Sequence, residues 1–245
     1  TVVNQYTVIV DTEPPAITTA SLQANSNAAE NGYNSSASPV LSVSAGDTGS
    51  GISGVYYMVS SSKLNDSIEN VTIDSPMTKS DSGYSRKLSL QEGTNYINVK
   101  VEDNAGNISY HTADSLLWNV DKTGPVIVFE SPDVSAMLSN KVAQNYKIKI
   151  SDELSGMMEN SEATISLVSK SGEDAAIAPQ TNNVQKDAAG NFYIQGIFTS
   201  EDMGKIQKGD AAELSVKVKD AVGNESSGKL MLTFDNTPPT VSIVN

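Results

Sequence analysis

The chain has 245 residues, a formal net charge of -13 and no cysteine. The acidic balance, without a cluster of Lys and Arg, argues against nucleic acid and anionic membranes as partners and favours cations. The lack of cysteine excludes disulfides and thiolate metal sites, and no apolar run approaches the roughly 18 residues that span a bilayer.

A Pro-containing junction motif divides the chain into repeats. It occurs at residues 11–17, 121–127 and 235–241, with the copies roughly 110 residues apart, which is close to the size of one β-sandwich domain. The start at Thr1 is interpreted as a cut inside a longer chain. The sequence therefore predicts two complete repeats, residues 11–120 and 121–234, preceded by the last strand of another repeat (residues 1–10) and followed by a linker and the start of a further repeat (residues 235–245).

Apolar residues at every second position predict a strand directly before each junction, because such alternation buries one face. The alternating positions are Tyr6, Val8 and Val10, then Leu116, Trp118 and Val120, then Leu230, Leu232 and Phe234. The same pattern predicts strands around residues 99–101, 148–150 and 216–218. Only residues 200–206 indicate helix, a single turn that Ser200 would cap.

Two further turn motifs recur in the same order in both repeats. They are Asp-x-x-Ser-Gly at residues 47–51 and 152–156, and Asp-x-x-Gly-Asn at residues 103–107 and 220–224. With the junctions, these motifs resemble bacterial immunoglobulin-like (Ig-like) repeats of large surface and secreted proteins, including adhesins and multidomain glycan-degrading enzymes. The resemblance implies an all-β fold of two tandem Ig-like β-sandwich domains, in an extracellular protein that is secreted or attached to the cell surface.

The topology of a seven-stranded sandwich predicts that the acidic motifs meet. The start of the first strand, the B–C turn and the F–G turn all lie at one end, next to the preceding domain. The residues expected there are Asp11, Asp47, Asp103 and Asn107 in repeat one, and Asp121, Asp152, Asp220 and Asn224 in repeat two, with Glu153 nearby. Two interpretations stay open: these oxygens bind calcium, which takes six to eight oxygen ligands, or Asp and Asn simply form the turns.

Catalysis has little support in the sequence. His111 is the single histidine and lacks a recognisable Ser or Cys partner, so an exposed strand residue is the simpler interpretation. Trp118 falls on the alternating core positions, which favours packing over sugar stacking. Tyr56 and Tyr57 are adjacent and should face opposite sides of a strand. We expect no enzyme, although the segment would suit an accessory region of a larger one.

Two functions remain as expectations. The first is a rigid stalk or spacer that presents other domains, with the neighbouring domains of the same chain as its partners. The alternative is an adhesin or carbohydrate-binding module that recognises a host glycan or protein. That alternative predicts an exposed aromatic or polar patch on one repeat that the other lacks, in segments 59–83 and 169–191, where the repeats differ most.

Overall fold

The chain forms two compact units that each build their own sandwich. The computed structural model describes residues 10–64, 68–112, 116–170, 176–206, 211–235 and 240–241. Unit 1 is Thr1–Lys122 and unit 2 is Thr123–Asn245, so the expected boundary after Val120 lies two residues from this division. Most of the expected flanking segments, residues 1–9, 236–239 and 242–245, lie outside the described residues; Val10 is described, exposed and not in a strand.

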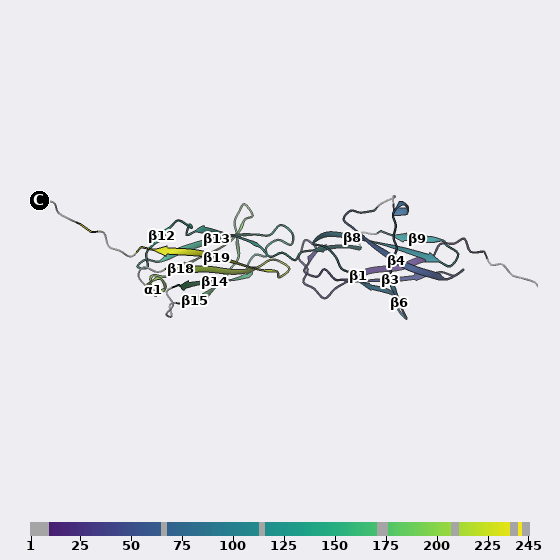
Figure 1. The fold of residues 1–245 in the computed structure, drawn as a ribbon, viewed down its shortest axis with the longest axis horizontal. Coiled ribbons are helices and arrows are strands. Elements are labelled where there is room, and N and C mark those ends of the chain that lie inside the picture. Colours follow the sequence, from purple (N-terminus) through teal and green to yellow (C-terminus); the bar gives the residue numbers. More distant parts are fainter. Residues whose placement is uncertain are drawn as a thin grey trace, which may run out of the picture. The chain divides into compact units, whose positions relative to one another are not determined.

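Unit 1 contains two facing sheets (Figure 1). The first has the antiparallel order β1-β3-β7-β6, with β1 (Ala16–Gln23), β3 (Val40–Gly46), β7 (Gly83–Lys87) and β6 (Thr78–Ser80). The second has the order β2-β10-β8-β4-β5, with β2 (Tyr33–Asn34), β10 (Leu117–Val120), β8 (Gly93–Asp103), β4 (Ile52–Ser60) and β5 (Ser75–Pro76). A further strand, β9 (Ile108–His111), pairs with the other half of β8. A 3-10 turn covers Ile68–Asn70.

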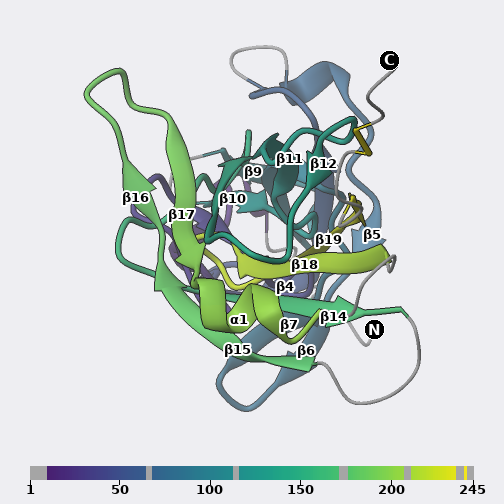
Figure 2. The same cartoon turned by 90° about the vertical axis from the view of Figure 1, so that its left-hand side faces the viewer.

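Unit 2 repeats this plan. Its first sheet has the order β11-β13-β17-β16, with β11 (Val126–Ser131), β13 (Gln144–Ser151), β17 (Phe192–Phe198) and β16 (Gln185–Lys186). Its second has the order β12-β19-β18-β14-β15, with β12 (Met137–Leu138), β19 (Glu225–Phe234), β18 (Ala211–Lys219), β14 (Glu162–Ser169) and β15 (Ala176–Asn183). One short helix, α1 (Ser200–Gly204), lies beside β17 (Figure 2). The prediction of two tandem Ig-like β-sandwiches is confirmed, because the strands pair as in that fold.

Each unit has a hydrophobic core of its own, filled by the alternating positions. In unit 1, Leu116 and Val120 are buried and Trp118 packs against the same cluster, so the core interpretation of Trp118 is confirmed. Its indole N–H donates to the Ser36 carbonyl at 2.8 Å. In unit 2, the final strand buries its predicted positions on one face: Leu230, Leu232 and Phe234.

Three local predictions can be compared with the structure. The helical turn exists, but Thr199 caps it rather than Ser200: Thr199 and Asp202 form a reciprocal capping box, which satisfies two backbone N–H groups at once. His111 is half-buried in β9 rather than exposed. Tyr57 packs against the core, whereas Tyr56 lies under the ammonium of Lys100, 4.6 Å from its ring centre, on the other face.

Candidate cation sites in the acidic turns

The structure brings the acidic residues of the first repeat together. Asp11 precedes β1, Asp47 follows β3 and Asp103 ends β8, and one carboxylate oxygen from each lies within 4.8 Å of the others. Asp103 is 1% exposed, and the other two are partly buried. We call these three residues acidic group 1. Asp11 lies 36 positions before Asp47 and 92 positions before Asp103 in the sequence. The three residues meet because the strand order of the sandwich returns each turn to the same end.

Backbone N–H groups hold each carboxylate of acidic group 1. Asp11 accepts from Ser50 at 2.7 Å and from Glu13 at 3.2 Å. Asp47 accepts through one oxygen from Gly49 at 3.1 Å and Gly51 at 2.6 Å. The hydrogen bonds from Ser50 lower the pKa of Asp11 below its usual value, so Asp11 is a carboxylate at neutral pH.

Asp103 and Asn107 close the turn after β8. Asp103 accepts backbone N–H bonds from Ala105 at 2.9 Å and Asn107 at 2.8 Å, and an amide bond from Asn107 at 2.8 Å. The Asn107 amide nitrogen also approaches the carbonyl oxygens of Asp11 at 3.3 Å and Glu13 at 3.4 Å. The side-chain nitrogen of Asn107 therefore connects the chain segment that enters unit 1 to the turn.

The second repeat carries the equivalent set. Asp121, Asp152 and Asp220 each offer an oxygen within 4.8 Å of the others, and we call them acidic group 2. Asp121 is 0% exposed and Asp220 is 3% exposed. Asn224 donates to Asp220 at 2.7 Å and to the Thr123 carbonyl at 3.1 Å. Glu153, expected nearby, is exposed and does not belong to the group.

Electrostatic repulsion is the feature that separates these groups from ordinary turns. Two carboxylates about 4 Å apart repel by about 4 kcal/mol at an effective dielectric constant of about 20. Within the described residues, no Lys or Arg forms an ion pair with Asp11, Asp47 or Asp103. A divalent cation would relieve this repulsion, and hard oxygen donors from three separate segments are the ligands that calcium prefers.

A third Asp-x-x-Gly-Asn turn supplies a comparison within the chain. Asp187 accepts backbone bonds from Ala189 at 2.9 Å and Asn191 at 2.8 Å, and Gly190 has a positive φ of 89°, as the equivalent Gly106 does at 92°. Asp187 belongs to neither acidic group. The turn motif therefore forms without a carboxylate cluster, and what distinguishes groups 1 and 2 is the arrival of two further Asp residues from other strands.

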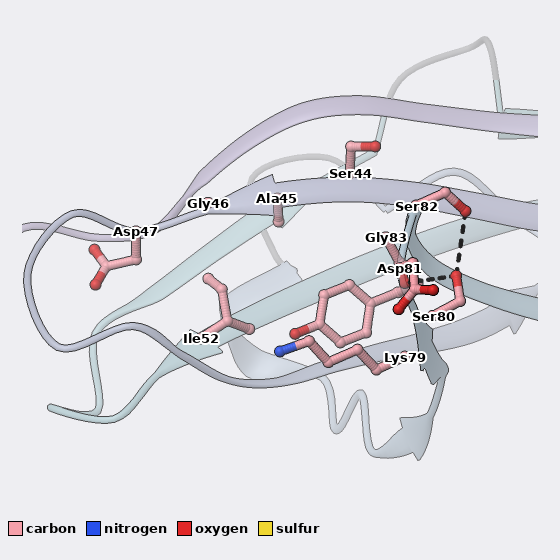
Figure 3. A pocket seen from close by; sticks show the side chains of 11 residues that line it. Ser44, Ala45, Gly46, Asp47, Ile52, Lys79, Ser80, Asp81, Ser82 and Gly83 are labelled. Atoms are coloured by element: carbon pink, nitrogen blue, oxygen red, sulfur yellow. Dashed lines mark hydrogen bonds between the residues drawn. The ribbon is translucent and has the colours of Figure 1, made fainter.

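Polar grooves lie on both units, and the one in unit 1 includes Asp47 of acidic group 1. In unit 1, a groove of about 420 Å³ lies between the end of β3 and the β6–β7 hairpin, with Lys79 and Ile52 on its walls. Figure 3 shows that Asp47, at its rim, points away from Lys79. In unit 2, a groove of about 540 Å³ lies over β13 and β17 and is lined by Asn145, Gln185 and Gln195, among others. Neither groove could be predicted from sequence patterns, because each combines residues from separate strands.

Comparisons with known proteins show likeness at the level of sheet architecture. No family model and no curated protein matches the sequence. The fibronectin(III)-like modules of CbhA from Clostridium thermocellum align at 11% identity over 89% of this chain and 94% of that chain, with a TM-score of 0.32. Protocadherin gamma B2 extracellular cadherin domains 1–5 align at 11% identity over 93% of this chain and 40% of that chain, with a TM-score of 0.40.

A 1.5-MDa bacterial ice-binding adhesin aligns at 17% identity over 88% of this chain and 64% of that chain, with a TM-score of 0.38. This chain thus spans less than two thirds of the protocadherin and adhesin chains. At these identities and TM-scores the likeness carries no argument about function. Separately, none of the helices in the described part of the chain has the length and apolarity needed to cross a bilayer.

Proposed function

We propose that this chain is a non-catalytic Ig-like repeat segment of a larger extracellular bacterial protein and acts as a rigid spacer between other domains. We further propose that acidic groups 1 and 2 each hold a calcium ion. The observation that carries the proposal is the position of Asp11: it lies in the segment that enters the sandwich, yet its carboxylate meets Asp47 and Asp103 from inside the same unit. A cation there would fasten the entering segment to the sandwich.

The connection between the units supports a stiff spacer. The Asp121 backbone N–H donates to the Asn34 carbonyl within unit 1 at 2.9 Å. The Thr123 carbonyl accepts from Asn224 within unit 2 at 3.1 Å. Only Lys122 therefore lies between two residues whose backbone is hydrogen-bonded into a unit. Short, anchored connections lose little conformational entropy when they become fixed, which is the property that a spacer of the proposed kind requires.

Calcium titration calorimetry on the whole chain tests the cation part of the proposal. We expect saturable binding with two sites per chain, and Asp47→Asn should remove one of them because it takes a charged oxygen from acidic group 1. Asp187→Asn is the control: it makes the same chemical change at an aspartate that accepts backbone N–H bonds in a turn outside both groups, and it should leave binding intact. Absence of calcium binding by the unsubstituted chain, or equal losses in the two variants, would remove the cation from the account.

A further inference from the structure

The groove over β13 and β17 lies on the face of the sheet that points away from the core. Asn145 pairs with Ile197 and Lys147 pairs with Gln195 across the two strands. These four side chains are exposed, and Asn145 and Lys147 flank Tyr146, which is 1% exposed and packs in the core. The volume of about 540 Å³ falls in the range of small-molecule sites.

Side-chain amides with unused hydrogen-bonding groups line this groove. Gln195 donates to the amide oxygen of Gln185 at 3.2 Å, which orients both side chains and leaves the Gln185 amide N–H groups and the Gln195 amide oxygen available. The side chain of Asn145 makes no hydrogen bond within the described residues. Each amide offers a donor and an acceptor, which is the pair of functions that a sugar hydroxyl uses.

The charged side chain that lines the groove, Lys147, has an acidic partner outside it. The Lys147 ammonium forms an ion pair with Glu130 at 3.0 Å and lies 5.3 Å from the ring centre of Tyr193. The positive charge is therefore already neutralised, and it does not select an acidic ligand. Ile197, 49% exposed, adds an apolar surface against which the C–H face of a sugar ring can pack.

The strands below the groove are paired with each other over residues 144–150 of β13. Strand β16 pairs with β17 only at Phe192 and Tyr193, so the β17 residues that line the groove, 195–197, have no partner in β16. Peptides that join a sheet pair with the free backbone of an edge strand, so an extended peptide is the competing occupant that the binding test must separate from a sugar.

Unit 1 lacks this set of side chains. The turn motif that starts at Asp47 corresponds to the one at Asp152, so β3 corresponds to β13 and β7 to β17. Val40 then stands at the position of Asn145, and Ser42 and Ser85, which pair across β3 and β7, stand at the positions of Lys147 and Gln195. Unit 1 has its own groove of about 700 Å³ at this end of β3 and β7, lined by Val40, Lys87, Gln23 and Asn25 among others. The two units therefore differ in the side chains that line this face.

From this geometry we propose that the groove formed by Asn145, Gln185, Gln195 and Ile197 binds a neutral oligosaccharide. The binding is a second function beyond the spacer role and does not depend on it, because the groove shares no residue with acidic groups 1 and 2. Loss of calcium binding would leave this proposal standing, and loss of sugar binding would leave the spacer proposal standing.

NMR titration of the whole chain tests the proposal directly. The probes are neutral hexasaccharides of β-glucose, mannose and N-acetylglucosamine at millimolar concentration, and the readout is the side-chain amide resonances of Asn145, Gln185 and Gln195. We expect at least one probe to shift all three. Replacing Asn145 and Gln195 by Ala should weaken that binding roughly tenfold or more, since two hydrogen-bonding groups are lost.

The paired variant Ser42→Ala with Ser85→Ala is the control, because it changes the equivalent positions of unit 1 and should leave sugar binding unchanged. Asn145, Gln195 and Ser42 are exposed and Ser85 is partly buried, so a retained amide spectrum will show that the fold persists. The proposal is overturned if none of the three sugars shifts the groove resonances, if the Asn145/Gln195 variant binds as well as the parent, or if an oligogalacturonate or an extended peptide binds the groove more tightly than every neutral sugar.

Discussion

Aspartate has two roles in this chain, and both start from the same local chemistry. At Asp103, Asp187 and Asp220, the carboxylate accepts backbone N–H bonds from residues two and four positions later. That pattern shapes a turn wherever Gly follows with a positive φ. The second role, membership of a carboxylate cluster, depends on tertiary neighbours. Of these three residues, Asp103 and Asp220 meet carboxylates from other segments, and Asp187 does not.

The lowered pKa of Asp187 predicts how the stability of unit 2 responds to acid. The side-chain and backbone hydrogen bonds from Asn191 lower the pKa of Asp187 from 3.8. A lowered folded-state pKa contributes stability that is present above the unfolded-state pKa and is lost as pH falls through the folded-state value. Asp187→Asn should therefore make unit 2 less sensitive to acid below about pH 4. Urea midpoints measured from neutral pH downward will show this, and parallel acid losses in both proteins would contradict it.

Gly49 is required for the approach of Asp11. A Cβ at this position would lie 2.5 Å from the Asp11 carboxyl carbon, so the side chains cannot both stay where they are. We expect Gly49→Ala to displace Asp11 and to weaken calcium binding at group 1 while the core of unit 1 stays intact. Calorimetry measures the binding. Gly46→Ala is the control, because a Cβ there meets nothing within 4 Å, and equal effects of the two variants would refute the role of Gly49.

The cap of helix α1 was predicted at Ser200, one residue later than Thr199, which caps the helix in the structure. Ser200 and Thr199 are both good capping residues, and only the partner three positions later decides between them. Thr199 finds Asp202, whose carboxylate accepts from the Thr199 backbone at 3.0 Å. Thr199→Ala should lower the free energy of unfolding of unit 2 by about 1 kcal/mol, measured by urea denaturation, whereas Ser200→Ala should change it by less. A larger loss of stability from Ser200→Ala than from Thr199→Ala would indicate that Ser200 is the cap.

Strands could be predicted where one face is buried, since Leu116, Trp118 and Val120 place large apolar side chains at every second position. The convergence of acidic group 1 also followed from sequence, because strand order in a seven-stranded sandwich fixes which turns share an end. Two features did not follow. The last strand of unit 1 is divided into β9 and β10, and the groove of unit 2 depends on the register between β13 and β17, which no local pattern records.

Over the whole molecule, the two cores are separate clusters, one in each unit. Leu41 is 0% exposed in unit 1, and Leu41→Ala should lower the free energy of unfolding of that unit by about 2–5 kcal/mol through lost burial and a residual cavity. Unit 2 should keep its own transition. Scanning calorimetry resolves this: one transition should move to lower temperature and the other should stay. A single transition that shifts as a whole would show that the units unfold together.

A spacer must be stiff, and small-angle X-ray scattering of the whole chain measures its stiffness. We expect the chain with calcium to give the profile of a stiff particle, and a chelator to give a broader distribution of maximum dimensions. The double variant Asp47→Asn with Asp152→Asn should give the broad distribution in calcium as well, whereas Asp187→Asn should behave as the parent does. Identical profiles with calcium and with chelator would contradict the claim that cations at the acidic groups fix the segments that enter each sandwich.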